Sequence, residues 1–247
     1  MTKSLRALLE GLIDYAGLFP PAALSMQDAV RNYARYREGA HAWALGRFVV
    51  PADRAGEVPS EFPLSILGID EVKAASVEDV DRIARAAAGR TVYVEITDLS
   101  LLDAIGRHGL RAKIRTGGVT EDAFPDIANV AAFLRACREK GVAFKATAGL
   151  HHPLRCVRAL TYEPGSATGT MHGFLNVFLA AAMTDRAEEI LAEQDPSVFH
   201  FDDDGASWRD ARVSTDDLIA MRRDFATSFG SCSFEEPIRD LQELGWL

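Results

Sequence analysis

Three short segments decide the fold: TVYVEIT (residues 91–97), RAKIRT (111–116) and VAFKATA (142–148). In each segment apolar side chains alternate with polar ones, which is the period-two pattern of a β-strand with two different faces. Helical patterns lie between them, over residues 99–107 and 125–140, and each ends close to a glycine. Strand and helix therefore alternate along the chain, an order that predicts a parallel sheet covered by helices.

The same alternation extends in both directions from this stretch. The further strand candidates are residues 12–18, 43–50, 64–69 and 227–232, and the further helix candidates are 28–37, 77–88, 173–183 and 214–225. Ser233-Phe-Glu-Glu236 predicts a capping box that begins a last helix. The 247 residues come close to the roughly 250 of a (β/α)8 barrel. We therefore predict an α/β fold, a single TIM-like (β/α)8 barrel domain over residues 1–247, with a doubly wound open sheet as the alternative.

The chain after residue 150 is less regular than the part before it. Asp202-Asp-Asp-Gly205 separates two strand-like runs, which predicts a β-hairpin insertion near residues 198–213. Eight barrel strands are reached only if residues 171–178 or this hairpin supplies the seventh strand. The sequence leaves the choice between these two segments open.

Composition and charge exclude several classes of protein. The net charge is −9 and no Lys/Arg block occurs, whereas nucleic-acid binders carry a basic surface. The longest apolar run, residues 173–183, is shorter than the roughly 20 residues that span a bilayer. The three cysteines are scattered and form no C-x-x-C motif. We expect a cytoplasmic protein that binds neither nucleic acid nor membranes, with assembly into a homo-oligomer left open.

The polar rows of the three deciding strands form a candidate active site. In a barrel the more apolar row packs under the helices, so the polar row points into the interior. That row consists of Glu95, Lys113, Arg115, Lys145 and Thr147, all near the C-terminal ends of their strands, where barrel enzymes carry out catalysis. Buried charges are costly unless they are paired, so this set favours a functional site over an internal salt-bridge cluster that only fills the barrel.

Each of the two lysines begins a short motif, Lys113-Ile-Arg-Thr-Gly-Gly and Lys145-Ala-Thr-Ala-Gly. These segments resemble the strand ends of class I aldolases of the deoxyribose-phosphate type, where Lys-x-Ser/Thr-x-Gly stretches carry a Schiff-base lysine with a second lysine beside it. The resemblance covers only these segments. It implies that Lys145 or Lys113 is the nucleophile and that the other is the cation that helps the nucleophilic amine to lose its proton.

On this hypothesis the protein is a lyase that acts on a small anionic carbonyl compound without a cofactor. Lys145 is the nucleophile or base, Lys113 tunes the pKa of Lys145, and Glu95 transfers protons. His151 follows a strand end and is a further candidate for acid–base work. The residues expected to bind the substrate carboxylate or phosphate are Arg115, Thr147, Thr116, Gly117 and His152.

Two alternatives remain. The first is a metal-dependent isomerase, decarboxylase or hydrolase in which Glu95 with His151 or His152 binds a divalent ion and the lysines only stabilise charge. Adjacent side chains diverge, so at most one of the two histidines is expected to face the site. The second alternative is a non-catalytic barrel that binds small anions.

Overall fold

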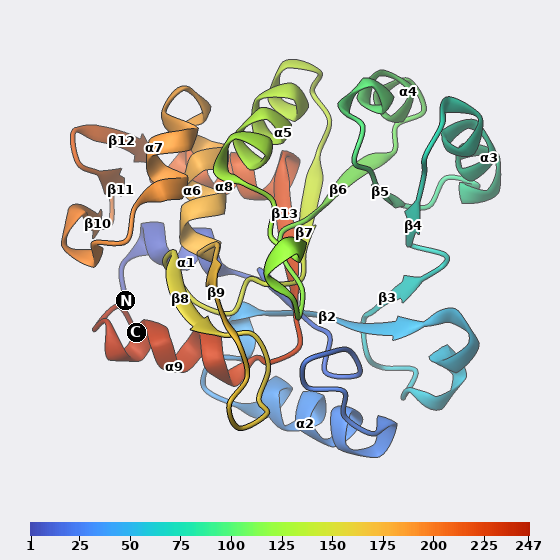
Figure 1. The fold of residues 1–247 in the computed structure, drawn as a ribbon, viewed down its shortest axis with the longest axis horizontal. Coiled ribbons are helices and arrows are strands. Elements are labelled where there is room, and N and C mark those ends of the chain that lie inside the picture. The colour runs from blue at the N-terminus through green and yellow to red at the C-terminus, as the bar shows by residue number, and fades with distance from the viewer.

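The computed structural model describes residues 1–247 and contains a closed barrel of eight parallel strands (Figure 1). The strands, in order around the barrel, are β1 (Ile13–Tyr15), β13 (Ala226–Ser231), β7 (Phe144–Thr147), β6 (Arg111–Arg115), β5 (Tyr93–Glu95), β4 (Glu71–Lys73), β3 (Leu64–Leu67) and β2 (Leu45–Pro51). The predicted (β/α)8 fold class is confirmed.

Helices follow most of the strands and cover the outside of the barrel (Figure 1). The α-helices are α1 (Lys3–Leu9), α2 (Met26–Glu38), α3 (Val77–Ala87), α4 (Leu102–Arg107), α5 (Ile127–Glu139), α6 (Phe174–Ala182), α7 (Ala187–Ala192), α8 (Thr215–Asp224) and α9 (Glu235–Glu243). Short 3-10 helices span Ala42–Ala44, Ala52–Glu57, Leu99–Leu101, Glu121–Ala123, Thr184–Arg186 and Pro196–Val198. None of the helices combines the length and the hydrophobicity needed to cross a membrane.

One barrel strand comes from an unexpected segment. The prediction that residues 171–178 or the inserted hairpin supply a strand is wrong, because β13 pairs directly with β7. The missing strand is β4, which follows β3 after a turn at Gly68–Asp70 and shares one register pair with it. Gly68 has φ +91°, and the Asp70 carboxylate accepts the backbone N–H of Ile66 at 3.0 Å. Parallel strands usually need a connection of a dozen or more residues, so the sequence pattern does not reveal two strands here.

The predicted insertion is present, with one strand more than expected. It is an antiparallel sheet of β10 (Phe199–Phe201), β11 (Gly205–Trp208) and β12 (Ala211–Ser214). Its first turn is the predicted one, and the Asp202 carboxylate accepts the backbone N–H groups of Asp204 and Gly205 there. A second pair of strands outside the barrel, β8 (Cys156–Ala159) and β9 (Thr168–Met171), forms a hairpin between β7 and α6.

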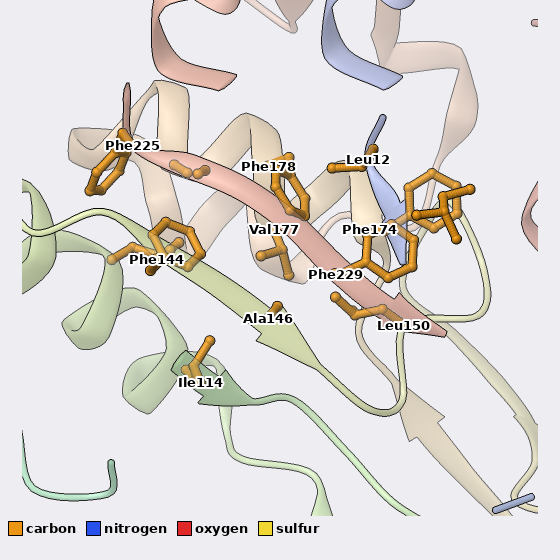
Figure 2. Close-up of a cluster of buried hydrophobic side chains, with 14 of the residues drawn as sticks. Leu12, Ile114, Phe144, Ala146, Leu150, Phe174, Val177, Phe178, Phe225 and Phe229 are labelled. Atoms are coloured by element: carbon orange, nitrogen blue, oxygen red, sulfur yellow. The ribbon is translucent and has the colours of Figure 1, made fainter. Parts of the chain in front are cut away.

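The apolar rows of the barrel strands pack against the helices. Figure 2 shows Phe144 of β7 and Phe229 of β13 beside the side chains of α6. Phe174 stacks on Phe229 with ring centroids 5.2 Å apart, and Phe178 lies 6.4 Å from Phe144. Burial of these rings in one apolar core fixes which face of each strand points outward. The alternate side chains are consequently directed into the barrel interior.

Candidate active site

A buried network of lysines and carboxylates occupies the barrel interior. Lys113 and Lys145 are register partners on β6 and β7, and Glu95 pairs with Lys113 across β5 and β6. Lys145 Nζ donates hydrogen bonds to Asp14 Oδ2 at 2.7 Å and to Glu71 Oε1 at 2.6 Å. Lys113 Nζ lies 2.8 Å from Glu71 Oε2 and 3.0 Å from Glu95 Oε2. Glu71 therefore bridges the two lysines.

Asp14 and Glu71 are the functional candidates that sequence reasoning missed. The polar rows predicted three cations with one carboxylate, whereas the structure adds these two carboxylates to the same space. Asp14 gave a signal, since it is a lone charge inside the apolar run 12–18. Glu71 gave none, because its neighbours Asp70 and Lys73 make the segment look like an exposed turn. The interior is therefore less cationic than the sequence suggested.

Asp14 is held in place by several backbone and side-chain contacts. Its Oδ1 accepts the backbone N–H of Arg47 at 2.7 Å, and its Oδ2 accepts the Ser228 hydroxyl at 2.8 Å. A Cβ atom at Gly46 would lie 2.3 Å from Asp14 Oδ1, so only glycine permits this close approach. Lys145 is 1% exposed as a result, enclosed by its carboxylates.

Opposite charges outweigh burial in setting the protonation of this network. Burial would raise the pKa of Glu71, but the ammonium groups of Lys145 and Lys113 lower it to about 2. Burial would lower the pKa of Lys145, but Asp14 and Glu71 raise it above its usual value. Lys145 is therefore an ammonium at neutral pH, and it must lose a proton to a partner before it can attack a carbonyl group. The surroundings of Lys145 thus disfavour the nucleophilic role that the sequence motif implied for it.

A cavity of about 310 Å³ lies at the Lys113 side of the network. Among its lining residues are Lys113, Arg115, Thr147 and His151, which the sequence had singled out, and also Glu71. Lys145 does not line it. The apolar part of the lining consists of Ala16, Phe19, Pro20, Pro21, Val49, Leu67, Val119 and Ala148. This volume is at the lower end of the range of ligand pockets, so the cavity suits a small molecule with one charged and one apolar part.

Lys113 and Glu95 have fewer hydrogen bonds to protein groups than Lys145 has. Glu95 Oε2 is buried, and it lies 3.0 Å from Lys113 Nζ. Its other oxygen, Oε1, accepts a hydrogen bond from Arg115 Nε at 3.3 Å. Burial would raise the pKa of Glu95, but Lys113 and then Arg115 lower it. Lys113 therefore combines contact with the cavity and a neighbouring carboxylate that has unused acceptor capacity.

Three predicted substrate-binding residues do not line the cavity. Thr116 is buried, and its hydroxyl donates to a backbone carbonyl of the loop after β7 at 2.7 Å. Gly117 packs so closely on Gly149 that a Cβ at position 117 would lie 2.8 Å from the Gly149 Cα. His152 Nδ1 lies 2.5 Å from Asp240 Oδ2. These residues join the loops and the last helix, and so they support the cavity wall.

No group of three or more His, Cys, Asp and Glu side chains is arranged to hold a metal ion. Glu95 contacts Lys113 and Arg115, whereas His151 Nδ1 lies 3.1 Å from Glu236 Oε2. The metal-dependent alternative needs Glu95 and a histidine to share one ion. In the structure these side chains contact different partners.

A parallel eight-stranded barrel with helices between its strands is an architecture typical of enzymes. The chain matches no protein-family model, no curated protein and no solved structure. The aldolase resemblance thus rests on the two lysine motifs alone. The chain has the (β/α)8 fold, and the chemistry of its cavity is the basis for proposing a function.

Proposed function

We propose that the protein is a lyase of the aldolase type, in which Lys113 forms a Schiff base with a small anionic carbonyl compound. One observation carries the proposal: of the two lysines inside the barrel, Lys113 lines the cavity and Lys145 does not. The role that the sequence motif left open between the two lysines thereby goes to Lys113. Lys145 then holds Asp14 and Glu71 in place through its two ion pairs.

The Lys113 ammonium must lose a proton before it can attack. Glu95 supports this step, because its Oε2 is 3.0 Å from Lys113 Nζ. Arg115 lowers the pKa of Glu95, as does Lys113. A substrate anion bound to Arg115 would offset part of the Arg115 charge and make Glu95 a stronger base. Substrate binding and proton removal are in this way coupled.

Lys113 and Glu95 supply all the protons that the covalent step needs. Glu95 takes one proton from the ammonium, and the free Nζ electron pair forms a bond to the carbonyl carbon while the π pair moves to oxygen. A second nitrogen proton passes to that oxygen, and Glu95 returns its proton as the C–O bond breaks and water leaves. The product is a protonated imine, which can accept the electron pair of an adjacent breaking C–C bond.

Arg115 and Thr147 are the proposed anion contacts. Both line the cavity, and Arg115 follows Lys113 by two positions on β6, so the two side chains extend from the same face of the strand. A guanidinium can bind a carboxylate or phosphate through two parallel hydrogen bonds. This pairing fixes the carbonyl carbon of a short substrate near Nζ.

Reductive trapping tests the proposal. The protein is incubated with pyruvate, 2-oxobutanoate, glyoxylate and glyceraldehyde 3-phosphate, and sodium borohydride then delivers hydride to any imine carbon. We expect a stable adduct on Lys113 by peptide mass spectrometry, lost in Lys113→Met and retained in Lys140→Met, which changes a partly exposed lysine outside the barrel interior. An adduct on Lys145 instead, or turnover of one of these compounds without any adduct, would contradict the proposal.

A non-catalytic anion-binding barrel is the second candidate. It is favoured by the ion pairing of both interior lysines, since an anion could bind to Arg115 without any proton transfer. In that case the same compounds raise the melting temperature of the protein but are neither trapped nor consumed.

A further inference from the structure

His151 lines the cavity, and its ring nitrogen Nδ1 faces a carboxylate. Its Nδ1 lies 3.1 Å from Glu236 Oε2, and the residue lines the cavity. Its Nε2 makes no hydrogen bond within the protein, and it is not among the buried unsatisfied atoms. Nε2 thus has no protein partner and is not fully buried.

Glu236 is itself held by two further contacts. Its backbone N–H donates to Ser233 Oγ at 3.1 Å, which is half of the predicted capping box. Its carboxylate does not complete that box, because Oε2 accepts the Tyr162 hydroxyl at 2.7 Å and faces His151. Tyr162 lies between β8 and β9, so a hairpin outside the barrel and the helix α9 meet at this carboxylate (Figure 1).

The protonation of Glu236 follows from these contacts. Burial would raise its pKa, but the hydrogen bonds from His151 and Tyr162 lower it, so the carboxylate is ionised at neutral pH. An ionised carboxylate only accepts hydrogen bonds, and the proton of a neutral His151 ring must then be on Nδ1. In that neutral ring the Nε2 atom carries a free electron pair.

We propose that Glu236 and Tyr162 are positioning residues that hold His151 in the Nδ1–H tautomer, with Nε2 as the base for proton transfer in the cavity. The inference rests on the proposed function for the identity of the reacting carbon. Once the imine on Lys113 has formed, Nε2 takes a proton from the carbon next to it. The C–H electron pair forms the enamine double bond, and the imine π pair moves to nitrogen. In the direction of C–C cleavage, Nε2 takes the proton of the hydroxyl group that becomes a carbonyl, the C–C electron pair forms the enamine, and the protonated ring then gives its proton to the enamine carbon.

The adjacent pair His152–Asp240 provides an internal comparison. It also joins the loop after β7 to α9, with Nδ1 and Oδ2 2.5 Å apart. His152 does not line the cavity, and no tyrosine hydroxyl donates to Asp240. If both histidines only attach the loop to α9, replacing Glu236 or Asp240 by its amide should have the same effect in the measurements below.

A measurement on the free protein tests the tautomer without any substrate. In 15N-histidine NMR spectra we expect the wild-type His151 ring as the Nδ1–H tautomer. Glu236→Gln should shift His151 toward a mixture of tautomers, since an amide can donate as well as accept, and Asp240→Asn should leave His151 unchanged. Wild-type His151 as the Nε2–H tautomer, or no response to Glu236→Gln, would overturn the proposal.

A second measurement follows the proton transfer itself. The rate of deuterium uptake from D2O at carbon 3 is measured for pyruvate or 2-oxobutanoate, whichever gives the borohydride adduct. We expect His151→Gln to lower this rate by about 100-fold or more. Glu236→Gln and Tyr162→Phe should lower it to a smaller extent, and Asp240→Asn should leave it unchanged.

The two proposals fail in different ways. Absence of an adduct on Lys113 refutes the Schiff-base function, and the NMR result still decides the role of Glu236. If the Lys113 adduct forms in normal yield and Glu236→Gln does not change the rate of deuterium uptake by the substrate, the positioning role alone is refuted. Equal effects of Glu236→Gln and Asp240→Asn on uptake would refute it as well.

Discussion

Two regions inside the barrel each contain a lysine, and only one of these lysines lines the cavity. Lys145 lies in a closed region, where it donates hydrogen bonds to Asp14 and Glu71 and does not line the cavity. Lys113 is its register partner on the neighbouring strand, yet it lies in an open region, between Glu71 and Glu95 and against the cavity.

The difference shows that position on the strand does not by itself give a lysine its chemistry. Two hydrogen-bonded carboxylates fix Lys145 as a structural cation, and the same enclosure shields it from any ligand. Lys113 has a carboxylate neighbour with unused acceptor capacity and access to a ligand. The closed region should therefore determine stability, and the open region should determine chemistry.

The largest expected effect is on Glu71, which belongs to both regions. Glu71→Gln leaves two buried ammonium groups without their shared carboxylate, and we expect the free energy of unfolding to fall by about 3–5 kcal/mol. Urea unfolding followed by circular dichroism measures this loss. Glu95→Gln is the matched control and should cost less, because Lys113 keeps Glu71. Equal losses would show that the two regions do not differ in stability.

The two lysines should differ when each is replaced by methionine. Lys145→Met leaves Asp14 and Glu71 buried with fewer partners, and we expect a loss of about 3 kcal/mol. Lys113→Met should cost less than Lys145→Met, since Glu71 keeps Lys145 and Glu95 keeps Arg115. Unfolding of both variants under one set of conditions gives the difference. A larger loss for Lys113→Met would reverse the assignment of the two regions.

Acid should weaken the closed region in a defined direction. The pKa of Glu71 is lowered from 4.5 to about 2 on folding, so its contribution is present above about pH 4.5 and is lost as the pH falls toward 2. We expect the free energy of unfolding to decrease over this range in the wild type and to decrease less steeply in Glu71→Gln. Urea midpoints measured at a series of pH values show the two slopes. Parallel slopes would mean that carboxylates other than Glu71 dominate the loss of stability in acid.

The smallest expected effects come from the two serines that donate hydrogen bonds to the carboxylate partners of Lys145. Ser65 donates to Glu71 Oε1 at 2.6 Å, and Ser228 donates to Asp14 Oδ2 at 2.8 Å. Alanine at either position should cost about 1 kcal/mol, because one buried hydrogen bond is lost while the ion pairs remain. Melting temperatures of the two variants provide the check. A loss as large as that of Lys145→Met would indicate that the serines, more than the charges, hold the region together.

Much of the site could be predicted because strand alternation is local. The polar rows of β5, β6 and β7 were expected to bring Glu95, Lys113 and Lys145 together. In the structure Glu95 is the register partner of Lys113, Lys113 is that of Lys145, and Lys113 Nζ lies 3.0 Å from Glu95 Oε2. Asp14 and Glu71 could not be placed in the same way. Their strands are too short to show a period, and one of them begins directly after the turn that ends β3.

The sequence by itself determined the fold class and the face of the central strands that carries the charges. Alternation of apolar and polar residues and the spacing of helices are local properties, so they survive without knowledge of the partners. Only the tertiary structure decided that β4 completes the barrel, that Glu71 bridges the two lysines, and that Glu236 faces His151. Closure of the barrel brings together residues far apart in the chain, and the charge and enclosure that give each lysine its chemistry arise only from that closure.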